Sequence, residues 1–207
     1  IGAPIFVVGT IYSWWPVINS TLVLKLAGTE GMGLYSMVLV AGGALDIVPM
    51  AVAQVIYPRM AEQYGKGSSV KEMMHLAWAP MLITVACLIP VVIAGWWLVG
   101  PAIRLLVSEY EAAVPAIQWS LLLPITNTLA VSNSIFNVIR RQDLYLLAIL
   151  GGIAANGLGL IWLVRGQVTL VAFPQAMLIG RISFVVLCHI AIAFLMRHEK
   201  LHTTEVR

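Results

Sequence analysis

Apolar residues run along this chain in six long segments, which short polar connections separate. A helix needs about 20 apolar residues to cross the hydrocarbon core of a bilayer, and each segment is long enough. The pattern predicts an all-α integral membrane protein with one six-transmembrane-helix bundle over residues 1 to 207. The expected helices span residues 4 to 27, 34 to 57, 74 to 99, 113 to 137, 144 to 164 and 171 to 196.

Composition supports the membrane assignment. Hydrophobic residues make up 60% of the 207 residues, charged residues only 10%, and the mean hydropathy is +0.94. A soluble domain carries roughly 25% charged residues. The chain begins at Ile1 and enters an apolar segment almost at once, so we expect it to be part of a longer protein. Cys87 and Cys188 lie in apolar runs without metal-ligand spacing, and we expect neither a disulfide scaffold nor a metal site.

Basic residues alternate between the connections. Three side chains, Lys25, Arg104 and Arg165, fall on one side, and eight fall on the other: Arg59, Lys66, Lys71, Arg140, Arg141, Arg197, Lys200 and Arg207. The positive-inside rule then places both ends of the chain in the cytoplasm, with residues 197 to 207 as a cytoplasmic tail. The net charge of +3 is an orientation signal, because a nucleic-acid site would gather its cations in one patch.

Besides Lys25 near the end of the first span, two charged residues lie well inside the spans, where insertion of each costs at least about 2.5 to 3.5 kcal/mol. Arg181 lies about 22 Å from a cytoplasmic boundary near Met196, counted at about 1.5 Å per residue. This depth fits either an anion contact or a side chain that snorkels to the outer headgroups. Asp46 fits a packing carboxyl, a cation or proton site, or an ion-pair partner of Arg181.

Uncharged polar residues also recur within the spans. Thr126, Ala130, Asn133 and Asn137 form one small, polar stripe at helical spacing in the fourth span, and Asn19 lies in the first. Such residues either line a hydrated cavity or join helices by hydrogen bonds. His189 is either a proton carrier or a packed neutral side chain. In the fifth span, Gly151, Ala155 and Gly159 repeat every four residues, which predicts close helix contact.

Enzyme signatures are missing from the sequence. It contains no GxSxG, HExxH or Walker A motif and no cluster of histidines and carboxylates at ligand spacing. We therefore expect a protein that is not an enzyme and that needs no cofactor.

Four short motifs carry a family resemblance. They are "LKLAGTEGMGLYSM" (24 to 37), "IYPRMAEQYGKG" (56 to 67), "RLLVSEYEAAVPAIQ" (104 to 118) and "NVIRRQDLY" (137 to 145). In order and spacing they resemble the C-terminal half of polysaccharide flippases, the O-antigen and lipid-linked oligosaccharide translocases of the MOP superfamily.

The resemblance implies a MATE-like twelve-helix transporter, of which this chain is the second six-helix lobe. Its partner is the N-terminal six-helix lobe or a second copy. Such proteins move an undecaprenyl-diphosphate-linked oligosaccharide to the periplasmic leaflet of the bacterial inner membrane by alternating access, coupled to H⁺ or Na⁺. Substrate contacts are then expected from Arg181, Lys25, Asn19, Asn133 and Asn137, and charge coupling from Asp46 and His189.

Two departures from the family pattern concern the site and one connection. Asn19 and Ser20 stand where family members often have Asp-Arg, and Arg140 stands where glycine is usual. A multidrug exporter of the same superfamily is an alternative, since Asp46 with Trp14 and Trp15 suits a cationic drug. A noncatalytic membrane assembly subunit is another.

Overall fold

The computed structural model describes residues 2 to 205 of the chain, with side chains described for residues 3 to 197. Helices account for 91% of the residues, and the described part contains no strand. Five apolar helical stretches are long enough to cross a membrane: Ala3–Gly65, Val70–Leu106, Ser108–Val138, Gln142–Leu163 and Ala172–Arg197. The predicted all-α class is therefore confirmed, and the five stretches are compatible with a membrane bundle, whereas the predicted count of six helices is not confirmed.

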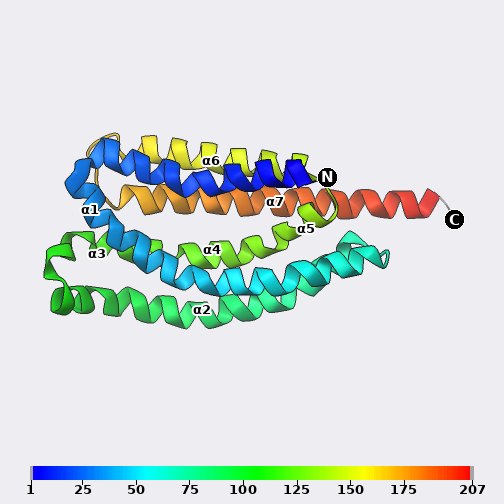
Figure 1. Ribbon diagram of the computed structural model, residues 1–207, viewed down its shortest axis with the longest axis horizontal. Coiled ribbons are helices and arrows are strands. Elements are labelled where there is room, and N and C mark those ends of the chain that lie inside the picture. Colours follow the sequence, from blue (N-terminus) through cyan, green and yellow to red (C-terminus); the bar gives the residue numbers. More distant parts are fainter. Residues whose placement is uncertain (1, 206–207) are drawn as a thin grey trace.

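The described chain contains seven α-helices, which are labelled in Figure 1, and two 3₁₀ helices. They are α1 (Gly2–Gly65), α2 (Val70–Leu106), the 3₁₀ helix η1 (Ser108–Ala113), α3 (Val114–Ser120), α4 (Leu123–Leu129), the 3₁₀ helix η2 (Ala130–Asn133), α5 (Ser134–Val138), α6 (Gln142–Leu163) and α7 (Ala172–Glu205).

Helix α1 doubles back on itself at Gly28 (Figure 1). Gly28 has φ 75° and ψ −173°, a left-handed conformation that glycine adopts without steric cost. We call residues 2 to 27 the first arm and residues 29 to 65 the second arm. The predicted spans leave residues 28 to 33 as the connection between the first two helices. This connection is wrong in length, because the chain reverses at Gly28 alone and residues 29 to 33 are helical.

The connection between α1 and α2 is also shorter than predicted. The hydropathy pattern predicts a polar connection over residues 58 to 72, but α1 continues to Gly65 and α2 begins at Val70. A capping box explains the early start of α2: Ser69 Oγ accepts from the backbone N–H of Glu72, whose carboxylate accepts from the N–H of Ser69. At the other end of the chain, residues 197 to 205 continue α7 as a helix, and residues 206 and 207 lie outside the described part.

The fourth apolar segment is irregular, although the hydropathy pattern predicted one helix over residues 113 to 137. It runs through α3, α4, η2 and α5, with a turn between α3 and α4. Pro124 has no N–H and cannot bond the carbonyl of Ser120, which interrupts the helix there. The hydroxyls of Thr126, Thr128 and Ser132 each bond a backbone carbonyl three or four residues back, and such bonds compete with regular helix geometry.

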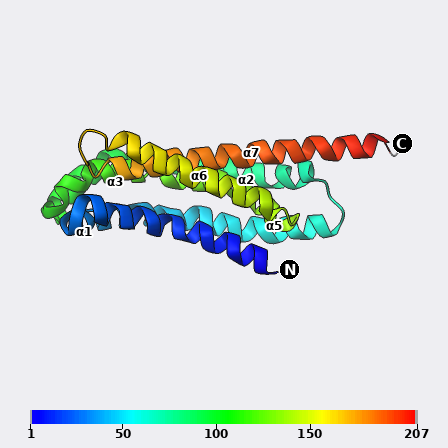
Figure 2. The ribbon, with the colours of Figure 1, turned by 90° about the horizontal axis from the view of Figure 1, so that it is seen from above.

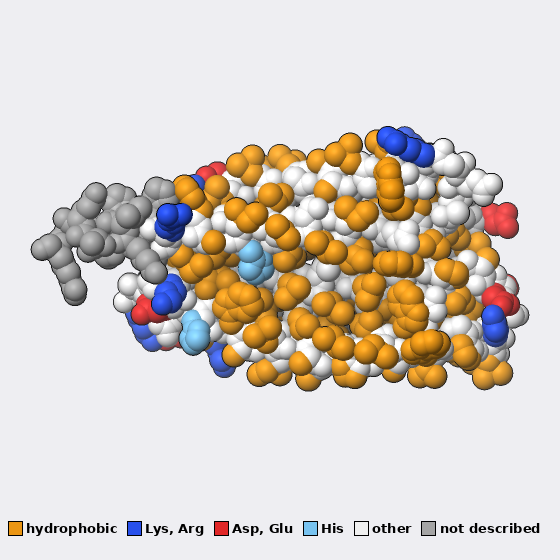
Figure 3. Space-filling model, turned by 180° about the vertical axis from the view of Figure 1, so that it is seen from behind, with side chains coloured by type: hydrophobic (Ala, Val, Ile, Leu, Met, Phe, Trp, Pro, Cys, Tyr) orange, Lys and Arg blue, Asp and Glu red, His pale blue; other side chains and the backbone are white. Residues whose placement is uncertain are grey.

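Charged side chains gather at the two ends of the bundle and leave an apolar band between them on the face shown in Figure 3. Both ends of the described chain, the α1–α2 turn and the α5–α6 junction lie at one end of the molecule (Figures 1 and 2). The Gly28 bend and the α6–α7 loop lie at the other. The connections that the charge pattern assigned to one side of the membrane are thus together in space.

Helices α6 and α7 pack against each other more extensively than any other pair of elements in the described chain (Figure 1). Glycines permit this close approach: a Cβ atom on Gly151 would lie 2.5 Å from Leu187, and one on Gly159 would lie 3.2 Å from Ile179. The small-residue repeat predicted for the fifth span therefore does mediate helix contact.

Gly152 and Gly180 also make room for the indole of Trp15, which is 0% exposed. A Cβ atom added to Gly152 would lie 2.6 Å from Trp15 Cη2, and one added to Gly180 would lie 2.8 Å from Trp15 Cζ2. The indole Nε1–H donates to Asn156 Oδ1 at 3.0 Å. The first arm is thereby attached to α6 and α7 through one side chain.

The separation of charged ends predicts opposite accessibility for cysteines at exposed positions 66 and 165. In a background with Cys87 and Cys188 replaced by serine, we expect Arg165→Cys to react with a membrane-impermeant maleimide in intact spheroplasts. Lys66→Cys should react only after the membrane is permeabilised. Labelling of position 66 from outside would invert the predicted orientation, and labelling of both from one side would contradict the bundle.

Gly152→Ala should destabilise the fold by about 1 to 3 kcal/mol, because its methyl group overpacks the Trp15 contact. Gly157→Ala is the matched control on the same helix, since a Cβ there meets no atom within 4 Å. We expect Gly157→Ala to be neutral or stabilising by up to about 1 kcal/mol. Thermal unfolding of the full-length protein in detergent measures both. Equal melting temperatures for the two variants would contradict the packing described.

Candidate functional site

Arg181 of α7 is buried against the first arm. Its side chain is 6% exposed, and its Cζ atom lies 4.5 Å from the ring centroid of Trp15 and 4.7 Å from that of Tyr12. The guanidinium Nη1–H donates to the Tyr12 hydroxyl. Both rings therefore provide cation–π contacts inside the bundle. The snorkelling interpretation is wrong, because the side chain is covered by protein instead of reaching the outer surface.

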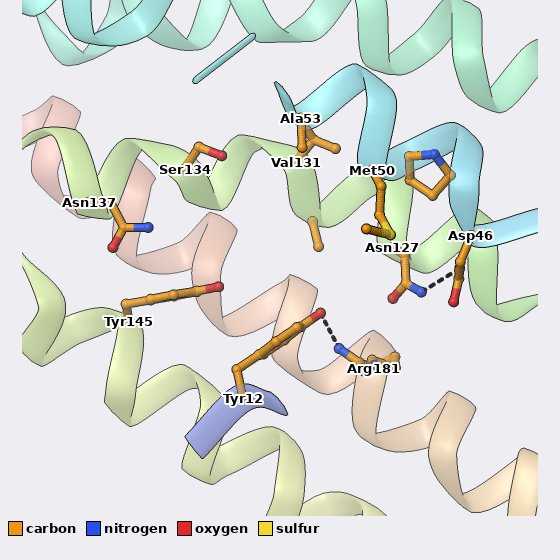
Figure 4. A pocket seen from close by; sticks show the side chains of 12 residues that line it. Tyr12, Asp46, Met50, Ala53, Asn127, Val131, Ser134, Asn137, Tyr145 and Arg181 are labelled. Carbon is orange, nitrogen blue, oxygen red and sulfur yellow. Dashed lines mark hydrogen bonds between the residues drawn. The ribbon is translucent and has the colours of Figure 1, made fainter. Parts of the chain in front are cut away.

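The larger of two neighbouring cavities, about 350 Å³ in volume, lies beside Arg181 (Figure 4). Its walls come from both arms of α1, the irregular fourth segment, α6 and α7. The lining residues are Tyr12, Asp46, Pro49, Met50, Ala53, Asn127, Ala130, Val131, Ser134, Asn137, Tyr145 and Arg181.

A smaller cavity of about 140 Å³ adjoins the larger one. Asn19 and Tyr35 contribute to its wall, and Asn19 Nδ2–H donates to the Tyr35 hydroxyl at 2.9 Å. Arg181, Asp46 and Asn127 line both cavities. These three side chains therefore form the polar boundary between the two cavities.

Asp46 is held by Asn127, whose Nδ2–H donates to Asp46 Oδ1 at 2.8 Å (Figure 4). The carboxylate and the guanidinium of Arg181 attract each other electrostatically. Within the described chain, however, no ion pair at 4.0 Å or less joins them. The direct Asp46–Arg181 pair considered from the sequence is not present in this conformation, and both charges face the cavities.

Arg181 has unused capacity for hydrogen bonding. A guanidinium has five N–H donors, and the bond to Tyr12 is the one that the described residues provide. Because the side chain lines both cavities, its remaining donors can bind an anion there. A planar fork of this kind matches the two oxygens of a phosphate or carboxylate group.

The structure brings together four of the seven predicted site residues. Arg181, Asp46 and Asn137 line the larger cavity, and Asn19 lines the smaller one. The remaining three, Lys25, Asn133 and His189, line neither.

Each of these three has a different environment. Lys25 is exposed on the surface of the first arm. Asn133 is buried, and its Oδ1 and Nδ2 have no hydrogen-bond partner among the described residues. His189 Nδ1 lies 2.8 Å from the Val185 carbonyl oxygen, and its ring packs edge-on against Trp78. His189 therefore resembles a packed side chain more than a member of the cavity wall.

The sequence pattern did not identify Asn127, Ser134 or Tyr145 as site residues. The helical stripe in the fourth span contains Thr126, whose hydroxyl bonds the Leu123 carbonyl at 2.7 Å. The cavity is instead lined by Asn127, Ala130, Val131, Ser134 and Asn137, which recur every three or four residues and therefore lie along one neighbouring face of this segment. That face shares Ala130 and Asn137 with the predicted stripe.

The environment of the tryptophans does not favour a cationic-drug site. Trp14 is 59% exposed and lines neither cavity. Trp15 is buried, but Arg181 occupies its ring face. A cationic drug at this position would meet a guanidinium.

Comparison of the chain with protein-family models, curated proteins and solved structures returned no match.

Proposed function

We propose that this chain is the second six-helix lobe of a transporter that flips an undecaprenyl-diphosphate-linked oligosaccharide from the cytoplasmic to the periplasmic leaflet of the bacterial inner membrane. One observation carries the proposal: the buried side chain of Arg181 presents unused N–H donors to two cavities that polar side chains line in part. The four sequence motifs that resemble flippases are consistent with it.

A diphosphate is the ligand that suits this arginine best. A buried charge without full compensation is costly in a membrane protein, so intramembrane arginines face partners or water-filled cavities. Tyr12 and Trp15 compensate the Arg181 charge only in part, because their rings provide cation–π contacts and the Tyr12 hydroxyl accepts a single hydrogen bond. Phosphate oxygens would accept the remaining N–H donors through charge-assisted bonds. Binding and release of the diphosphate is the task of the site, and no covalent bond changes.

The two arms of α1 act as separate crossings in this proposal, so that the chain crosses the bilayer six times. The end rich in basic residues faces the cytoplasm. Alternating access needs a second lobe that moves against this one, either an N-terminal six-helix lobe of the same protein or a second copy. A gradient of H⁺ or Na⁺ drives the cycle through Asp46, the carboxylate that shares both cavities with Arg181.

Arg181→Ala in the full-length gene should reduce surface O-antigen in a complemented flippase-deficient strain by at least about tenfold, measured relative to the amount of variant protein in the membrane. Arg181→Lys should retain part of the activity, because it keeps the charge and loses the planar fork. Lys25→Ala is the matched control, as Lys25 is exposed and lines neither cavity. Normal surface glycan with Arg181→Ala would refute the proposed anion contact.

Asp46→Asn should slow transport that is driven by a cation gradient several-fold, because the variant removes the charge at the boundary of the cavities. The side chain keeps its shape and can still meet Asn127. Proteoliposomes that contain the full-length protein, with an imposed pH or Na⁺ gradient, provide the measurement. Glu62→Gln changes a fully exposed acid and is expected to have no effect. An unchanged rate with Asp46→Asn would remove Asp46 from the coupling mechanism.

A further inference from the structure

Tyr145 forms an ordered aromatic wall in the part of the larger cavity farther from Asp46 (Figure 4). Its ring stacks on Phe136 with centroids 5.8 Å apart and an interplanar angle of 16°. Phe184 packs against the same ring at 6.0 Å. Aromatic contacts in these geometries hold the ring of Tyr145 in one orientation.

Unused polar groups lie across the cavity from this ring. Figure 4 shows Ser134 and Asn137 on the wall opposite Tyr12 and Tyr145. Within the described chain no hydrogen bond engages the side chains of Ser134 and Asn137 or the hydroxyl of Tyr145, although other hydroxyls of the fourth segment bond backbone carbonyls. An amide and two hydroxyls supply both donors and acceptors to a ligand.

We propose that Tyr145, Asn137 and Ser134 form a subsite for the first sugar of the substrate, the one attached to the diphosphate. The inference rests on the proposed function, because Arg181 at the adjoining end of the cavity holds the phosphate. A pyranose ring has apolar C–H faces and a rim of hydroxyl groups. Its face packs on Tyr145, and its hydroxyls bond Asn137 and Ser134.

The charge and size of the cavity restrict the sugar. Asp46 and Arg181 are the charged residues of the lining, and both lie at the end away from Asn137 (Figure 4). The subsite therefore recognises an uncharged sugar and has no cation for an acidic one. A volume of about 350 Å³ is near the lower limit of roughly 300 to 1,000 Å³ for small-molecule sites, so the cavity holds the first sugar and not the whole glycan.

Two kinds of soluble probe separate the sugar contact from the phosphate contact. One is geranyl diphosphate, and the other is geranyl diphosphate carrying a single glucose, galactose or N-acetylglucosamine, each titrated against the purified full-length protein. We expect at least one sugar-bearing probe to bind about tenfold tighter than geranyl diphosphate. Tyr145→Leu and Asn137→Leu should each remove about fivefold of this gain and leave the affinity for geranyl diphosphate unchanged.

Control variants keep the result interpretable. Tyr57→Leu removes a tyrosine that lies outside the cavity and should preserve the gain. Asn137→Leu retains the aromatic contacts of Tyr145 and supplies the test if Tyr145→Leu does not fold. The subsite is overturned if no sugar-bearing probe binds tighter, or if Asn137→Leu weakens all probes equally. If Arg181→Ala leaves the affinity for geranyl diphosphate unchanged, the proposed anion site fails instead.

Discussion

The guanidinium of Arg181 is buried within an apolar bundle. The packing of the first arm, α6 and α7 depends on the contacts that compensate its charge. Lipid offers no hydrogen bonds, so the compensation has to come from protein. Tyr12 and Trp15 provide it from the first arm, which binds that arm to α7. Trp15 in turn needs Asn156 as acceptor and the two glycines at the α6–α7 crossing for space. One buried charge thus specifies the relative position of the first arm, α6 and α7.

The same contacts leave most N–H donors of Arg181 free to bind a ligand. Two aromatic faces lower the cost of burying the charge without consuming the N–H donors, whereas a carboxylate in direct contact would have consumed two of them. Asp46 instead accepts a hydrogen bond from Asn127 and does not pair with Arg181. Two opposite charges therefore line the same cavities without forming a direct ion pair, and this arrangement is suited to reversible binding of a charged group.

Hydropathy was sufficient to predict the fold class, because a bilayer imposes one length and one backbone geometry on every crossing. Each of the six predicted segments overlaps helical structure. The ends of the helices followed other rules. A single glycine at position 28 reverses α1, and the Ser69 capping box starts α2 within a stretch whose polarity had suggested a loop. Such local effects depend on a few backbone atoms and do not appear in a hydropathy average.

It was harder to predict which residues form the site than to predict that the chain has one. Arg181 and Asp46 could be identified from the sequence, because a charged residue within an apolar segment costs free energy to insert into the bilayer. To identify the uncharged residues, it was necessary to know which face of the fourth segment meets the cavity, and the predicted stripe shares Ala130 and Asn137 with that face. Asn133 shows the consequence: it fits the regular stripe and yet lies buried away from the cavities. Packing against α1 and α7 decides which face of the fourth segment meets the cavities, so the stripe in the sequence was not sufficient to identify Asn127 and Ser134.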